Sequence, residues 1–142
     1  MYGIVLAIHS LLRWGVLAAG LAAVVRGGAR GSSTGKWFTI LLDVQMLLGL
    51  LLYFVLSPFT RAALGDFGGA MKNSQLRFFA VEHVVGMVIA IALAHIGRKK
   101  ILQAREERKA KLAMIFYGLA LVAILASIPW PGMPAGRPLF RF

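Results

Sequence analysis

The sequence contains no cysteine, and this absence excludes several kinds of chemistry at once. A chain without thiols forms no disulfide, holds no iron–sulfur cluster and offers no thiolate to a metal. It also has no covalent haem attachment motif, because that motif requires two cysteines. Any metal bound by this chain must be held by histidine, methionine or carboxylate side chains.

Acidic residues are scarce as well, with five Asp and Glu against 16 Lys and Arg and a formal net charge of +11. Such a charge is found in nucleic-acid-binding proteins, which carry it as a continuous basic face. Here most basic residues fall in two short loops between apolar segments. We therefore expect no nucleic-acid partner.

Charged residues of both signs make up only 15% of the chain, whereas apolar residues make up 59%. Soluble domains have about 25% charged residues. Four apolar segments, at about residues 3–25, 36–57, 74–97 and 110–128, are each long enough to cross the hydrocarbon core of a bilayer. The first lacks a basic start and a cleavage site, so we expect it to persist as a helix. The sequence predicts an all-α, integral membrane four-helix bundle with antiparallel up-down connectivity, followed by a Pro-rich tail at 129–142.

The distribution of basic residues predicts the orientation of the bundle. Two loops carry ten Lys and Arg, namely Arg26, Arg30, Lys36, Arg98, Lys99, Lys100, Arg105, Arg108, Lys109 and Lys111. The opposite side carries five, namely Arg61, Lys72, Arg77, Arg137 and Arg141. Because cytoplasmic loops are enriched in Lys and Arg, both termini are expected on the non-cytoplasmic side. The charged stretch at residues 98–111 is expected to extend the third and fourth helices as a solvated turn, and binding of anionic lipid head groups is its functional alternative.

Two histidines are predicted to lie at similar depth in the outer half of the membrane. His9 is about six residues into the first span, or ~9 Å from its outer end, and His83 is about nine residues past Ser74, or ~13 Å in. Ionisable groups in a membrane span are costly unless they are paired or ligated. Neutral imidazole is a common ligand of haem iron. The pattern favours His9 and His83 as the two axial ligands of one non-covalent haem b between the first and third spans.

Three neighbouring residues fit the same hypothesis. Arg13 lies at i+4 from His9, on the same helix face, and Arg77 lies near the outer end of the third span. Guanidinium groups suit the two haem propionates. Gly86, at i+3 from His83, is expected to leave room for a porphyrin beside the backbone.

The remaining polar residues of the spans leave alternatives open. Glu82 is expected to form an intramembrane ion pair with Arg13, and Asp43 is the competing partner for that arginine. These charges either neutralise each other and fix the helix register, or Glu82 or Asp43 accepts a proton coupled to quinone chemistry. Gln45 and Tyr53 are candidates to hydrogen-bond a quinone carbonyl or another helix. His95 is expected to hydrogen-bond or to lie at the membrane interface.

At these residues the chain resembles a small family of bacterial four-helix membrane proteins sometimes labelled cytochrome b-like. The matching segments are His9-Ser10-Leu11-Leu12-Arg13-Trp14, residues 45–54, Met71-Lys72-Asn73-Ser74, residues 76–83 and Ala126-Ser127-Ile128-Pro129-Trp130-Pro131. The resemblance implies the four-helix fold and a bacterial inner (cytoplasmic) membrane, and it implies no enzyme activity. In similar chains the position of Asp43 is expected to be polar and often histidine, so this chain departs from that pattern and lacks a ligand there.

Three functions compete at this stage. The first is a small b-type cytochrome that exchanges electrons with quinone or a respiratory partner. The second is a cofactor-free accessory or assembly subunit of a larger membrane complex. The third is a transporter or channel module, which would require a homo-oligomer because four helices rarely enclose a pathway alone. In each case an electron carrier or subunit is expected rather than a stand-alone enzyme.

Overall fold

The computed structural model describes residues 1–141, and all of its regular secondary structure is helical. Four long helical segments dominate the chain. They are α1 (Tyr2–Arg26), α2 (Thr34–Leu51) continued by the π-helix η1 (Leu52–Leu56), the series α5 (Ser74–Arg77), π-helix η2 (Phe78–Glu82) and α6 (His83–Gln103), and α7 (Glu106–Ser127). The predicted all-α class with four long apolar helices is confirmed.

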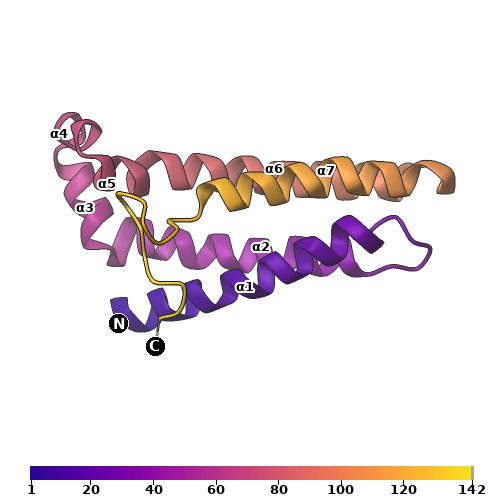
Figure 1. Cartoon of the computed structure of the whole chain (residues 1–142), viewed down its shortest axis with the longest axis horizontal. Coiled ribbons are helices and arrows are strands. Elements are labelled where there is room, and N and C mark those ends of the chain that lie inside the picture. The colour runs from indigo at the N-terminus through magenta and orange to yellow at the C-terminus, as the bar shows by residue number, and fades with distance from the viewer. Residues whose placement is uncertain (142) are drawn as a thin grey trace.

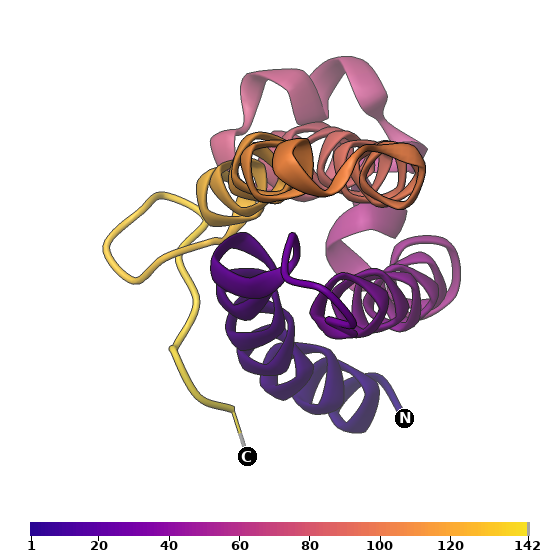
Figure 2. The same ribbon diagram turned by 90° about the vertical axis from the view of Figure 1, so that its right-hand side faces the viewer.

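The four long helices lie side by side around a shared core (Figures 1 and 2). Helix α1 contacts α2 and α7, and α6 contacts α7 and α2. Both chain termini lie at one end, together with α3 (Pro58–Gly65), α4 (Phe67–Lys72) and α5 (Figure 1). We call this the termini end. The opposite loop end holds the connections at residues 27–33 and 104–105.

The helix ends follow from local capping chemistry. The side-chain oxygen of Asn73 accepts hydrogen bonds from the backbone N–H groups of Gln75 (3.0 Å) and Leu76 (3.1 Å), as expected of an N-cap. Ser57 caps α3, and Pro58 at its first position fits because that position needs no N–H donor. At the loop end, α6 continues to Gln103 and α7 begins at Glu106. The charged segment therefore extends both helices beyond the predicted apolar spans of 74–97 and 110–128.

Each long helical segment is long and apolar enough to cross a membrane. Five of the thirteen buried residues in the main core cluster are alanines, which let the α6 and α7 backbones approach closely. Large apolar side chains instead point outward from all four segments, including Ile4, Leu21, Leu47, Phe54, Val88, Ile96, Met114 and Val122. Soluble monomers rarely expose so extensive an apolar surface. The outer faces of the bundle are therefore suited to an apolar surrounding.

The helices pack closely near the loop end, around Tyr117 of α7. The Tyr117 ring is almost fully buried and meets Phe38 edge to face, with ring centroids 5.7 Å apart. A Cβ atom placed on Gly35 would overlap the Tyr117 hydroxyl, and one placed on Gly28 would overlap the backbone of Ala110. Glycine at these two positions lets the chain segments come into direct contact.

Candidate functional site

A cavity of about 140 Å³ lies between the long helices at the termini end. An engineered apolar cavity of about 150 Å³ holds a benzene molecule, so this volume is that of one aromatic ring. Most of its wall is apolar. The polar residues in the wall include His9, Arg13, Gln45, Tyr53, Ser57, Thr60, His83 and Arg137. The two histidines predicted to act together therefore do line one space.

The hydrogen bonding of His83 fixes its tautomer. Its Nδ1 lies 2.7 Å from the backbone carbonyl oxygen of Ser127 on α7. Because a carbonyl only accepts hydrogen bonds, Nδ1 carries the hydrogen and donates it, and Nε2 keeps its lone pair. Metal-binding histidines characteristically donate their second ring N–H to a carbonyl or carboxylate in this way.

His9 faces His83 from α1. The two ring centroids are 6.3 Å apart, and the ring planes are inclined by 73°. The His9 Nδ1 is buried without a hydrogen-bond partner among residues 1–141. Gln45 on α2 donates from Nε2 to the His9 backbone carbonyl (2.9 Å), and a Cβ on Gly49 would lie 3.3 Å from the His9 ring. Helix α2 therefore positions His9 through the hydrogen bond from Gln45 and the close contact at Gly49.

Two π-helical turns bring the cavity wall together. Residues of η1 and η2 line the cavity, and η2 immediately precedes His83. The Tyr53 hydroxyl donates to the carbonyl of Ala80 (2.8 Å), which links the two turns. The Thr60 hydroxyl of α3 donates to the carbonyl of Tyr53 (2.6 Å). π turns are rare in proteins, and those that exist are often found at functional sites. No pattern in these two apolar sequences predicts a π turn.

The predicted ion pairs of Arg13 with Glu82 or Asp43 are not formed. Glu82 instead accepts a hydrogen bond from Arg77 Nε at 2.8 Å. Residues five apart in an α-helix point about 140° away from each other. The π turn of η2 lies between Arg77 and Glu82 and alters this spacing, so both side chains reach one face. The prediction assumed a regular α-helix and was wrong for this reason.

Asp43 is bound instead by His95, which forms a hydrogen bond as the first of its two predicted alternatives states. Its Oδ1 lies 2.8 Å from Nε2 of His95, across the contact between α2 and α6. Both side chains are nearly half exposed on the outside of the bundle. The Asp43–His95 pair and the Arg77–Glu82 pair therefore both lie outside the cavity.

Two residues predicted to surround a porphyrin do not line the cavity. Arg77 is occupied by Glu82 and by the carbonyl of Met71 (3.2 Å). A Cβ on Gly86 would overlap the Ser127 hydroxyl, so this glycine allows α6 to approach α7 and makes no room for a ligand. Neither residue therefore lies in the wall of the cavity, where the predicted contact with a porphyrin would place it.

The sequence analysis missed Arg137 as a site residue. Residues 129–141, the C-terminal tail, fold back over the termini end, and the Arg137 N–H donates to the carbonyl of Pro129 (2.9 Å). Its guanidinium carbon lies 4.4 Å from the ring centroid of Phe59 and 5.0 Å from that of Phe79. Burial against these rings lowers the pKa of the Arg137 guanidinium. No periodic pattern marks this residue, because the tail has no regular secondary structure.

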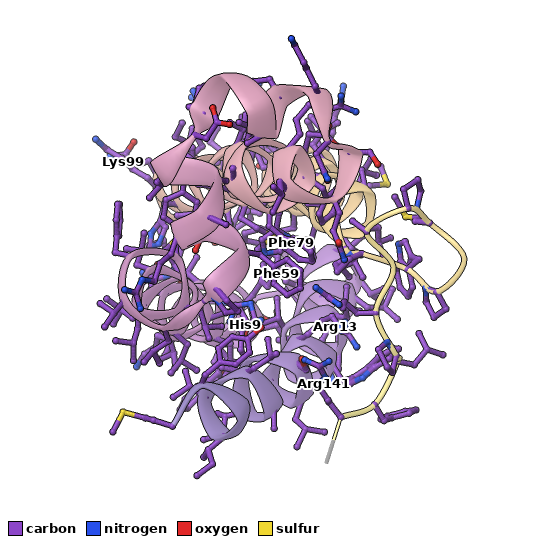
Figure 3. All side chains as sticks on the ribbon, turned by 90° about the vertical axis from the view of Figure 1, so that its left-hand side faces the viewer. His9, Arg13, Phe59, Phe79, Lys99 and Arg141 are labelled. Carbon is purple, nitrogen blue, oxygen red and sulfur yellow. The ribbon has the colours of Figure 1, made fainter. Side chains whose placement is uncertain are left out.

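Figure 3 shows the site from the termini end. The rings of Phe59 and Phe79 lie close to His9, and Arg13 lies on the side of the tail. The Arg13 Nη2 donates to the carbonyl of Leu139 in the tail at 2.5 Å, and its Nε is buried without a partner among the described residues. The tail therefore contributes directly to the site.

The side chains around the cavity suit a metal whose remaining ligands come from a cofactor and not from the protein. Protein sites for bare zinc use three or four side chains. Within residues 1–141 no group of three His, Asp or Glu side chains is placed to hold a metal ion, and the cavity wall contains no carboxylate. Two opposed imidazoles are the protein contribution expected for a haem, whose macrocycle supplies the other four nitrogens. The two imidazoles therefore match the protein ligands of a haem better than those of a bare ion, whereas the cavity volume as packed is that of one aromatic ring.

A comparison of the chain with protein-family models, curated proteins and solved structures finds no match.

Proposed function

We propose that the chain is an antiparallel four-helix bundle that spans the bacterial inner (cytoplasmic) membrane, with both termini on the non-cytoplasmic side. The four long apolar helices and their outward-facing apolar side chains support insertion. The basic loops gather at the loop end, and cytoplasmic loops are typically basic. In this orientation the cavity lies in the outer half of the membrane.

Within this bundle the protein is a small b-type cytochrome that holds one haem between His9 and His83. The observation that carries the proposal is the 6.3 Å distance between the two ring centroids. With metal–imidazole bonds of about 2 Å, and roughly 1 Å more from each nitrogen to its ring centre, an axial pair needs about 6 Å. The resemblance to cytochrome b-like four-helix proteins supports the same function.

The chain's own residues have distinct roles in this proposal. His9 and His83 bind the iron, and the Ser127 carbonyl keeps the imidazole of His83 oriented and basic. Bound haem supplies a one-electron redox centre. A macrocycle needs more width than the cavity offers as packed, and Met46 and Met87 in the wall are unbranched side chains that adapt readily. The electron partner is a quinone or a respiratory complex in the same membrane.

The visible absorption spectrum of the purified protein tests this function. We expect a Soret band that sharpens on reduction, and we expect both His9→Ala and His83→Ala to lose it. His95→Ala is the matched control, because His95 lies on the outside of the bundle beside Asp43. Circular dichroism confirms that each variant remains helical. A colourless, folded wild-type preparation would contradict the cytochrome and favour the cofactor-free subunit.

A further inference from the structure

The cavity carries positive charge without a counter-charge. Arg13 from α1 and Arg137 from the tail both line it, and no Asp or Glu does among the residues described. A charge removed from water is strongly unfavourable unless it is paired or fully hydrogen-bonded. The cavity therefore favours a ligand that carries negative charge.

Neither guanidinium is satisfied by the protein. Arg13 uses Nη2 for the Leu139 carbonyl, while its Nε is buried without a partner in residues 1–141. The guanidinium carbon of Arg137 lies over the rings of Phe59 and Phe79, and the described residues offer this side chain no hydrogen-bond acceptor. Arg77 differs, because Glu82 and the Met71 carbonyl occupy its donors. The two cavity arginines thus keep free donors where a ligand would bind.

Several contacts hold the tail in the position that this arrangement requires. The Leu139 carbonyl also accepts a hydrogen bond from Trp14 Nε1 (3.2 Å), and Phe140 stacks on the Trp14 ring with centroids 5.5 Å apart. At the start of the tail, Trp130 Nε1 donates to the carbonyl of Leu125 (2.8 Å). Contacts on both sides of Arg137 therefore fix the part of the tail that carries it.

We propose that Arg13 and Arg137 together bind the carboxylate groups of the haem, with the tail as an integral part of the cofactor site. This inference rests on the proposed cytochrome function. Guanidinium matches carboxylate geometry with paired hydrogen bonds, which are stronger than neutral ones. Arg137, some sixty residues later in the chain, takes the carboxylate-binding role that the sequence analysis assigned to Arg77.

The test compares haem with haem dimethyl ester, in which both carboxylates are blocked. Detergent-solubilised protein freed of cofactor is titrated with each compound, and dissociation constants are read from the Soret band. We expect wild type to bind haem at least roughly tenfold more tightly than the ester, because charge-assisted hydrogen bonds are lost. Arg137→Gln and Arg13→Gln each reduce that ratio, and Arg137→Lys restores part of it. Arg77→Gln, the matched control, leaves the ratio unchanged.

The outcomes separate this inference from the function on which it rests. If wild type binds haem and the ester equally well, the carboxylate site is overturned and the cytochrome stands. If Arg77→Gln lowers the ratio as much as Arg137→Gln does, the assignment to Arg137 is overturned. If wild type binds neither compound, the cytochrome itself is overturned, and the inference with it. The comparison of the two ligands in wild type is decisive even if a variant fails to fold.

Discussion

The two ends of the bundle are built from the same four helices, but within residues 1–141 only the termini end encloses a cavity. At the loop end, glycines let backbone and ring approach directly, as Gly28 does with Ala110 and Gly35 with Tyr117. At the termini end, the helices surround a cavity. The buried side-chain atoms that lack hydrogen-bond partners within the described part of the chain, His9 Nδ1, Arg13 Nε and Gln45 Oε1, belong to residues that line this cavity.

This difference indicates that the two ends of the bundle have different roles. Well-packed, fully satisfied regions supply stability, whereas departures from local rules are expected where a protein binds its ligand. Both π turns lie next to the cavity, and the loop end has only regular α-helix in its long segments. We infer that the loop end holds the helices together while the termini end is kept open for function.

The largest expected effect comes from adding one methyl group at the loop end. In Gly28→Ala the new Cβ would overlap the backbone of Ala110, which cannot rotate away, so we expect a loss of about 2–3 kcal/mol in the free energy of unfolding. Gly49→Ala at the termini end meets only the His9 ring at 3.3 Å, and less than about 1 kcal/mol should be lost. Denaturant unfolding in detergent micelles measures both. Equal losses would contradict the proposed difference between the ends.

A second comparison uses one tyrosine from each end. Tyr53→Phe leaves the Ala80 carbonyl without the donor that links the two π turns, and we expect a loss of about 1–2 kcal/mol. Tyr117→Phe removes a hydroxyl for which no hydrogen bond is found in residues 1–141, so a change within about 0.5 kcal/mol is expected. The same unfolding assay applies. A larger loss at Tyr117 would show that the loop end relies on polar contacts.

Much of the scaffold could be predicted from the sequence because its signals are local. Apolar length predicts the four helices, and Asn73 before Ser74 predicts the start of the third long segment. The placement of His9 and His83 around one space follows from the constant rise of a helix, since two segments that start at the same end bring similar residue counts to similar depth. These inferences need no knowledge of side-chain packing.

The partners of the charged groups could not be predicted in the same way. Glu82 pairs with Arg77 because a π turn intervenes, and a π turn depends on tertiary contacts such as the Tyr53 hydroxyl bond. Arg137 reaches the cavity only because an irregular tail folds back on the bundle. The sequence suggested that Gly86 leaves room for a ligand. In the structure Ser127 faces Gly86, so the missing side chain allows α7 to approach α6. Each error arises where structure is set by non-local contacts.

A third prediction sharpens the distinction between glycine that packs helices and glycine that makes room for ligand. Gly86→Ala places a Cβ into the Ser127 hydroxyl, and we expect a loss of about 1–2 kcal/mol. Ser127→Ala removes that hydroxyl while the backbone carbonyl that binds His83 remains, so it should cost less than about 1 kcal/mol. The double variant should recover much of the loss, as a double-mutant cycle would show. Strict additivity would mean that the two positions do not contact each other.

The smallest expected effect concerns the ion pair on the bundle surface at the termini end. Glu82→Gln breaks the half-exposed bond to Arg77, and such pairs contribute less than about 1 kcal/mol. Since Glu82 lies outside the cavity, the midpoint potential of a haem bound as proposed should show the same pH dependence in this variant as in wild type. Redox titration at several pH values measures this. A pH dependence that disappears in Glu82→Gln would instead make Glu82 a proton acceptor coupled to electron transfer, and the functional site would then extend beyond the cavity to the bundle surface.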